Sequence, residues 1–438
     1  MEDINTVRVC AELDSTQANS SVVVSKILYR LIPFVILLFF TNNLDRMNVS
    51  FAALTMNKDL GFSSVVFGMG AGIFFIGYFL FEVPSNLILS RVGARVWIFR
   101  IMLTWGIIVM LMPFVQNKIE FYILRFLLGV SEAGFAPGIQ LYLMRWVPKQ
   151  NLGRAYSLFM CAVPLSAVIG APLCSGLLRL DGIIGFAGWQ WLFIVTGLMA
   201  VILSFFVLYY LEDHPKNVTW LKTEERKWLV EKLKSEEEVI IREGGGTSLK
   251  SLLTPRVLGF SLVYFLFVIG IYGVGFWLPQ IMKSFGFTNI KAIMISAIPY
   301  VFATIAMILW SFHSDKKNER RWHLVSAQFL AAFGLCAAAL SSNHVLEIVM
   351  ITLSTIGVWA AIPVFWTQPP TFLSGTAVAA GIAMINSIGN LGGFVGPYIV
   401  GIIRQLTGSF SMALMTLAGS LFLSGLVALL VSRRKRAV

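Results

Sequence analysis

Residues 31–51 read LIPFVILLFFTNNLDRMNVSF, an apolar run that continues without a break into an Asp and an Arg. An ionisable side chain inside a bilayer costs several kcal/mol unless it is paired or hydrated. If a membrane helix begins near Arg30, a rise of about 1.5 Å per residue carries Asp45 and Arg46 past the middle of the bilayer but not out of it. The two charges are therefore predicted to be buried functional groups.

The composition excludes a water-soluble globule. Hydrophobic residues make up 57% of the 438 residues, charged residues only 13%, and the mean hydropathy is +0.79. These values indicate an all-α integral membrane protein that crosses the bilayer many times. The polar N-terminal segment lacks the pattern of a secretory signal, so it is predicted to stay in the cytosol. The cysteines lack metal-ligand spacing, so we expect neither a metal site nor a cofactor.

Twelve segments are apolar and long enough to cross the bilayer, which takes about 20 residues. They are predicted at 30–54, 67–90, 97–115, 119–144, 153–178, 189–211, 257–282, 290–312, 323–341, 344–370, 377–403 and 409–432. The predicted organisation is a cytosolic segment 1–29, a six-helix bundle 30–211, a cytosolic linker 212–256, a second six-helix bundle 257–432 and a basic cytosolic tail 433–438.

The distribution of basic residues predicts the orientation. Most of the 34 Lys and Arg residues fall on one side of the membrane if both termini are cytosolic. The positive-inside rule requires this asymmetry. It also accounts for the net charge of +12, so no nucleic-acid partner is expected. The linker contains TEERKWLVEKLKSEEE (223–238), which is typical of a solvated helix, and a flexible GGG at 244–246.

The two halves of the chain resemble each other. SRVGARVW (90–97) aligns with DKKNERRW (315–322), and the same offset aligns Pro172 of IGAP with Pro397 of FVGP. Basic turns alone match by chance, but the Gly/Pro pair does not readily follow at the same offset. We infer a duplicated six-helix unit, which gives two pseudo-symmetric bundles.

A second charged set lies in FYILRFLLGVSEAGFAPG (121–138). Arg125 and Glu132 are seven residues apart, close to two helical turns, so they should point from one face about 10 Å apart. Arginine keeps its proton and matches a carboxylate, which makes Arg46 and Arg125 candidate anchors for an organic anion. Desolvation makes Glu132 and Asp45 candidate proton-binding groups. The alternative is that these four charges neutralise one another and lock two helices together.

The remaining polar candidates fall outside this charged set. Glu82, in FEVPSN (81–86), is expected to be structural or gating through pairing with the basic residues of the following turn. In the second half, Asn386 needs a partner in mid-membrane and is the strongest candidate for a substrate contact. The other candidate substrate-binding residues are Asn43, Tyr272, Gln280 and Trp366.

Five stretches share a pattern with a known family of transporters. They are LDRMNVSFAALTMNKDLG (44–61), GYFLFEVPSNLILSRVGAR (77–95), LRFLLGVSEAGFAPG (124–138), GWQWLFIVTG (188–197) and INSIGNLGGFVGPYIVG (385–401). Together they resemble the major facilitator superfamily. More narrowly, they resemble its anion:cation symporter family, which includes bacterial permeases for hydroxyphenylacetate, tartrate, phthalate and sugar acids.

The resemblance implies a central anion site between two six-helix bundles. By this resemblance, Arg46 and Arg125 are implied to contact the anion, and Tyr78 and Asn386 are implied to make further polar contacts with it. The two carboxylates of the charged set are implied to bind the coupling proton.

The turns after the second helix of each half are implied to have gating or structural roles. Arg91 and Arg95 belong to the first turn, and Asp315 belongs to the second. Ser90 stands where the superfamily usually has Asp, so an inter-helix salt bridge is in doubt in the first half. Glu82 is expected to substitute for it in part.

These features predict a secondary transporter that imports a small organic anion with protons by alternating access. The anion is expected to be an aromatic, hydroxy or sugar acid. An anion exchanger that uses the same arginines is the main alternative, and a sensor that binds the anion without moving it is another. An enzyme is not expected, because no Ser/His pair or metal-ligand cluster lies within the predicted helices. The expected location is the bacterial inner membrane, with the protein a monomer surrounded by lipid.

Overall fold

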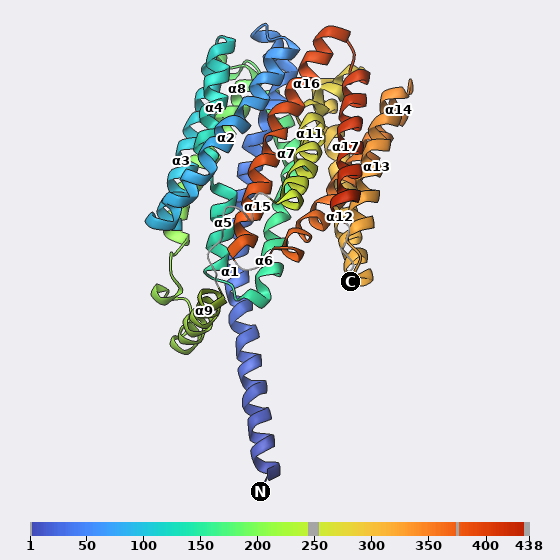
Figure 1. The fold of residues 1–438 in the computed structure, drawn as a ribbon. Helices are drawn as coiled ribbons and strands as arrows, with labels where there is room; N and C mark the ends of the chain where they lie inside the picture. Colours follow the sequence, from blue (N-terminus) through green and yellow to red (C-terminus); the bar gives the residue numbers. More distant parts are fainter. Residues whose placement is uncertain (1, 244–253, 374–375, 433–438) are drawn as a thin grey trace.

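The computed structural model describes residues 2–243, 254–373 and 376–432, which form helices joined by turns and short loops. No strand occurs in these ranges, and the long helices run side by side through the molecule (Figure 1). The all-α fold class predicted from composition is confirmed. The GGG at 244–246 and the basic tail at 433–438 lie outside the described residues.

The helices follow one another through short turns. Those of the first half are α1 (Glu2–Asp59), α2 (Ser64–Val92), α3 (Ala94–Leu111), α4 (Lys118–Glu132), α5 (Phe135–Met144), α6 (Lys149–Met160), α7 (Ala162–Leu177) and α8 (Gly188–Tyr210). The linker contains α9 (Thr223–Glu243). Those of the second half are α11 (Pro255–Ser284), α12 (Asn289–Lys317), α13 (Arg321–Leu340), α14 (His344–Trp366), α15 (Thr376–Asn390), α16 (Gly392–Thr407) and α17 (Ser411–Val431). Short 3₁₀ turns occur at Met112–Phe114, Leu178–Leu180, Ile183–Gly185, Pro215–Asn217 and Pro369–Thr371.

Ten helical stretches of the described chain are long and apolar enough to cross a membrane. The two other predicted segments are each divided into shorter helices. Segment 119–144 becomes α4 and α5, which are separated at Gly134, whose left-handed backbone (φ 84°) suits a residue without a side chain. Segment 377–403 becomes α15 and α16, which are separated at Leu391. These two segments are the ones missing from the ten stretches; segment 153–178 is also divided, into α6 and α7, but is counted as one stretch.

Helix α1 begins earlier than predicted. The sequence predicts a first membrane helix from residue 30, whereas α1 is continuous from Glu2 to Asp59. Its apolar part starts at Val22, because VVVSKILY extends the hydrophobic run toward the N-terminus. Figure 1 shows the start of α1 projecting away from the other membrane helices, on the side that carries α9. Lys26 of α1 pairs with Glu225 of α9, so the predicted charged linker helix is present and contacts α1.

The two halves meet closely where α2 passes α16. A Cβ atom added to Gly68 of α2 would lie 2.5 Å from the Pro397 carbonyl oxygen of α16, so only glycine permits this approach. Small residues allow such close contact between membrane helices. Near the same end, Lys283 Nζ of α11 donates a hydrogen bond of 2.9 Å to the Leu54 carbonyl of α1. The halves are therefore held together at the end of the molecule opposite α9 (Figure 1).

The predicted duplication has a structural counterpart. In each half the fifth predicted membrane segment consists of two helices, α6 and α7 in the first half and α15 and α16 in the second. Pro172 lies within α7 and Pro397 lies within α16. The two residues that the offset aligns therefore occupy the same part of their respective halves.

Candidate functional site

Arg46 and Glu132 form an ion pair between α1 and α4. Arg46 donates to Glu132 Oε2 from Nη2 at 2.6 Å and from Nε at 3.2 Å. Glu132 is the last residue of α4 and is fully buried, whereas 14% of the Arg46 side chain is exposed. Charge-assisted contacts of this kind are strong, and the buried charges need each other. Arg46 is therefore the more exposed member of the pair.

Aromatic side chains from both halves surround the Arg46 guanidinium. Its Nη1 donates a long hydrogen bond of 3.4 Å to the Tyr272 hydroxyl of α11. Its central carbon lies 5.0 Å from the Phe74 ring centroid and 5.3 Å from that of Tyr78, both on α2. The faces of such rings attract a cation. The structure therefore brings three predicted site residues, Arg46, Tyr78 and Tyr272, to one point between the halves.

Arg125 has backbone partners that the sequence did not predict. It is fully buried, and it donates from Nε to the Gly70 carbonyl at 3.1 Å and from Nη2 to the Ala71 carbonyl at 3.3 Å. Its central carbon also lies 5.2 Å from the ring centroid of Phe74, which Arg46 approaches as well. These contacts tie α4 to the N-terminal third of α2. Arg46 is consequently the stronger candidate for the anion anchor, and that role stays a prediction for Arg125.

Asp45 points away from Arg46 into the interior of the first half. Its carboxylate accepts hydrogen bonds from Trp105 Nε1 at 3.0 Å and from Asn48 Nδ2 at 3.3 Å. Asn48 in turn donates to the Thr196 hydroxyl at 3.0 Å. No cation lies within ion-pair distance of Asp45 in the part of the chain that the structure describes. Of the four charges considered for a mutual lock, only one ion pair is formed, and Asp45 is held by neutral donors.

One oxygen of Glu132 has no hydrogen-bond partner. Among the described residues no well-formed hydrogen bond reaches Oε1, and the buried Asn42 amide, which lies close to the Glu132 carboxylate, makes none either. Asn42 precedes Arg46 by four residues, a spacing that places both on one helix face and that could have identified it from the sequence. The predicted Asn43 instead donates to the Phe39 carbonyl of its own helix at 2.8 Å. Oε1 is therefore the Glu132 oxygen that is open to a proton, with the Asn42 amide as its neighbouring donor.

Glu82 is bound by the second half rather than by the basic turn that follows it. Its buried carboxylate accepts hydrogen bonds from Asn386 Nδ2 at 2.9 Å and from Ser387 Oγ at 3.1 Å, both on α15. The prediction that Glu82 pairs with basic residues is wrong, because Arg91 lies more than two helical turns further along α2. Asn386 has the partner that a mid-membrane amide requires. Ser387 is a member of this contact that the sequence reasoning missed.

Two other predicted substrate-binding residues lie apart from Arg46. Trp366, at the end of α14, packs edge-on against Tyr264 with ring centroids 5.0 Å apart. Gln280 follows Tyr272 by eight residues, which is about 12 Å along α11. The Nε2 atom of Gln280 has no hydrogen-bond partner within the described ranges. We expect Trp366 and Gln280 to contact a solute only at other depths of its path.

The first basic turn is anchored by a carboxylate from the linker. The backbone N–H of Arg95 donates to Asp213 Oδ1 at 3.0 Å. Asp213 thus supplies a carboxylate at the turn where Ser90 replaces the expected Asp. Glu82 does not substitute for it, contrary to the prediction, because its oxygens are engaged with α15. Arg91 is exposed, and its side chain has no hydrogen-bond or ion-pair partner among the described residues.

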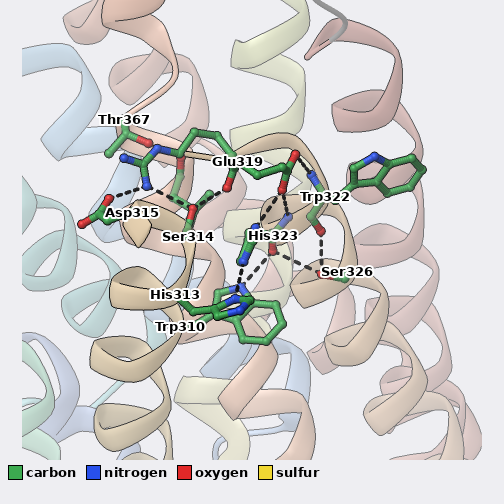
Figure 2. Close-up of polar contacts among 11 residues, drawn as sticks. Trp310, His313, Ser314, Asp315, Glu319, Trp322, His323, Ser326 and Thr367 are labelled. Atoms are coloured by element: carbon green, nitrogen blue, oxygen red, sulfur yellow. Dashed lines mark hydrogen bonds and ion pairs between the residues drawn. The ribbon is translucent and has the colours of Figure 1, made fainter. Parts of the chain in front are cut away.

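The second basic turn holds a chain of polar contacts (Figure 2). Asp315 forms an ion pair with Arg320. Glu319 Oε2 lies 2.7 Å from His323 Nδ1, and His323 Nε2 lies 2.8 Å from His313 Nδ1. Burial raises the pKa of Glu319, but the following backbone N–H groups and His323 outweigh burial and hold that pKa below its usual value. Side chains therefore fix the turn between α12 and α13.

The sequence is similar to several named transporters. The sequence profile of the Major Facilitator Superfamily matches residues 35–397. The "Putative tartrate transporter" of Agrobacterium vitis is 51% identical over 415 residues, covering 94% of this chain and 91% of the relative. The "Quinolone resistance transporter" of Acinetobacter baumannii is 41% identical, covering 90% of this chain and 91% of the relative. The "Inner membrane transport protein RhmT" of Escherichia coli K12 is 36% identical, covering 92% and 94%.

Solved transporter structures share the fold. A bacterial homologue of the human lysosomal transporter Spinster matches with a TM-score of 0.75 at 16% identity, covering 93% of this chain and 98% of that one. The xylose transporter XylE of E. coli matches with a TM-score of 0.75 at 13% identity, covering 93% and 97%. At these identities the likeness concerns the arrangement of the helices alone.

Proposed function

The chain belongs to the Major Facilitator Superfamily, and from this premise we propose that it carries a small hydroxy acid across the membrane together with protons. The family and the close relatives support a secondary transporter of organic anions, an integral membrane protein and not an enzyme. The particular acid, the coupling to protons and membership of the anion:cation symporter family are the parts that we infer.

The observation that carries the proposal is the ion pair between Arg46 and Glu132. Arg46 is partly exposed, whereas Glu132 is buried and has one oxygen without a donor among the described residues. A substrate carboxylate that reaches Arg46 competes with Glu132 for the same guanidinium. A proton on Glu132 removes the competing charge, so it strengthens the attraction between Arg46 and the anion. Anion binding and proton binding are thereby linked through one cation.

This linkage determines which charge states of the site allow the transporter to change between inward-facing and outward-facing conformations. With Glu132 protonated, Arg46 neutralises one carboxylate of the anion, so the loaded site carries no excess charge for a monocarboxylate, whereas the second carboxylate of a diacid needs neutral donors or a further proton. With Glu132 ionised and no anion bound, the ion pair neutralises itself and the empty site can return. An anion beside ionised Glu132, or Arg46 without any partner, leaves a net charge in a site of low dielectric constant and is disfavoured. Each cycle then moves one anion with at least one proton.

Hydroxy acids suit the surroundings of Arg46. The Tyr272 hydroxyl reaches the guanidinium, and the buried Asn42 amide lies beside Glu132 without a well-formed hydrogen bond among the described residues. Such groups can bind the hydroxyls of a substrate in addition to its carboxylate. Two relatives at 51% identity are named for tartrate, which makes tartrate the first acid to test. Aromatic acids and sugar acids, which can lie against the Phe74 ring, form the next group.

An anion exchanger is the second candidate function, because Arg46 alone can bind an anion without any proton. The free oxygen of buried Glu132 favours the symporter, since an exchanger needs no titratable group beside its site. We also propose a monomer in the bacterial inner membrane with both termini in the cytosol, on the basis of the asymmetric distribution of basic residues.

Uptake by proteoliposomes tests the function. The purified chain should accumulate labelled tartrate above its external concentration when the lumen is alkaline, and Arg46→Ala should abolish this. Glu120→Gln removes an exposed carboxylate at the start of α4 and serves as the matched control, with uptake equal to that of the parent. Uptake that requires an internal anion and ignores the pH gradient would establish exchange instead. Failure to move any hydroxy acid would refute the proposed substrate class.

A further inference from the structure

Glu82 is a buried carboxylate whose partners both come from the other half of the molecule. The residue is 5% exposed. Oε1 accepts a hydrogen bond of 2.9 Å from Asn386 Nδ2, and Oε2 accepts one of 3.1 Å from Ser387 Oγ. Within the described chain no cation lies at ion-pair distance from it. An amide and a hydroxyl therefore replace the water that would otherwise surround this carboxylate.

The two donors on α15 amount to a carboxylate-binding site. Asn386 and Ser387 are consecutive residues, and together they hold both oxygens of one carboxylate. Both donors are only partly buried, but an occupant that pairs with them still stabilises the empty transporter. The occupant is the end of the Glu82 side chain, which has the same chemistry as the end of an organic acid. Because α2 and α15 belong to different halves, the contact also fastens the halves together.

This donor pair lies near Arg46 along α2. Glu82 follows Tyr78 by four residues, which is one helical turn or about 6 Å along the axis. The Tyr78 ring lies against the Arg46 guanidinium. Two groups that bind carboxylates are therefore about one turn apart in depth. This neighbouring placement points to a dicarboxylate, with one end on Arg46 and the other on the α15 donors.

Building on the proposed function, we propose that Glu82 is a built-in substitute for the second carboxylate of a dicarboxylate substrate. In the empty transporter Glu82 occupies Asn386 and Ser387 and fastens α2 to α15. A dicarboxylate bound to Arg46 displaces Glu82, takes over both donors and releases the contact between the halves. An acid with one carboxylate cannot do this, so the exchange of partners selects dicarboxylates.

Binding measured by calorimetry on the purified full chain tests the substitution. Tartrate is the probe, and glycerate is the comparison because it is a hydroxy acid with one carboxylate. Glu82→Gln and Glu82→Ala remove the competing charge, so tartrate should bind about five- to tenfold more tightly while glycerate changes less than twofold. The control, Glu120→Gln, should bind tartrate as the parent does. Weaker or unchanged tartrate binding by both Glu82 variants, the result of a purely structural role, would overturn the proposal.

A second variant tests whether the donors on α15 bind the substrate carboxylate as well as Glu82. In the Glu82→Ala background, Ser387 has no carboxylate left to hold except that of the substrate. Adding Ser387→Ala should then weaken tartrate binding about fivefold, because a direct hydrogen bond to a charged group is lost. If Ser387→Ala has no effect once Glu82 is absent, the donor pair does not bind the substrate and the proposal fails.

A distance measurement without any anion tests whether Glu82 holds the two halves together, independently of the proposed transport function. Spin labels at the exposed residues Val92 and Trp322 lie at the ends of α2 and α13 nearest the basic turns and report the distance between the halves. Glu82→Ala should broaden this distance distribution relative to the parent and to Glu120→Gln. An unchanged distribution would overturn the fastening role. If the distribution broadens but no variant binds tartrate, the proposed function and the substitute role are refuted while the fastening role stands.

Discussion

Replacing Glu132 with Gln should separate anion binding from proton coupling. The substitution keeps the volume of the side chain and one acceptor oxygen for Arg46, and it removes the negative charge that Arg46 faces at 2.6 Å. Arg46 then has no permanent counter-ion in the empty site. We expect the variant to bind tartrate more tightly than the parent at neutral pH and to lose accumulation driven by a proton gradient.

The magnitude follows from the geometry of the pair. Opposite charges about 4 Å apart attract by about 4 kcal/mol at an effective dielectric constant of about 20. The Gln amide oxygen retains part of the interaction, and a hydrogen bond to a charged group contributes about 1.5–3 kcal/mol. The substrate should recover the difference between these two energies, about 1–2.5 kcal/mol, which corresponds to a dissociation constant roughly five- to seventyfold lower. The parent should approach the same affinity as the pH falls, because protonated Glu132 resembles Gln.

Two assays check this expectation. Calorimetry across a pH series should show a dissociation constant that is nearly independent of pH for Glu132→Gln. For the parent, the dissociation constant should decrease as the pH is lowered. Proteoliposomes should show counterflow exchange of tartrate by the variant without uphill uptake. Parent-like accumulation would refute the proton role of Glu132, and weaker binding at every pH would show that its charge supports the site instead of competing for Arg46.

Four further predictions concern other positions. Arg46→Lys keeps the charge but loses the planar fork, so calorimetry should show tartrate binding weakened about tenfold or more; parent-like affinity would exclude Arg46 as the anchor. Asp45→Asn should alter affinity and the number of protons moved per anion together, and no change in either would make Asp45 structural. A cysteine at Lys58 should react with an impermeant external reagent and one at Lys234 should not, the opposite pattern reversing the orientation. Glu319→Gln should lower the thermal unfolding temperature at pH 7. This difference should disappear as the pH falls through the lowered pKa of Glu319, because ionised Glu319 stabilises the fold only above that pKa. A difference that persists in acid would show that the charge of Glu319 is not its cause.

Hydropathy predicted the helices well because a membrane permits few alternatives. Every backbone polar group must be paired inside the bilayer, so an apolar run of sufficient length is helical. The positions at which helices divide were not predicted. Gly134 ends α4 with a left-handed backbone, whereas other glycines in the chain lie within continuous helices. Which glycine interrupts a helix depends on the neighbours that pack around it, and the local sequence does not contain them.

The sequence predicted which residues belong to the site better than it predicted which atoms those residues contact. Charges in a membrane are rare, so Arg46 and Glu132 were identifiable from the sequence, and the structure shows that they meet. Adjacent residues on a helix point about 100° apart, so Asp45 and Arg46 face different neighbours. Those neighbours, including Trp105 on α3, are set by how the helices pack. Glu82 illustrates the same limit, because its donors are more than 300 positions away in the chain.

Helix α2 packs against the second half from Gly68 to Phe75 and meets it again at Glu82, and the fourteen residues from Gly68 to Glu82 span about 21 Å. If Gly68 acts as a fulcrum, this length is a lever arm. A tilt of roughly 10° about the fulcrum displaces Glu82 by about 4 Å, which is farther than a hydrogen bond can follow. A rotation that barely changes the contact at Gly68 is therefore enough to part the helices at Glu82.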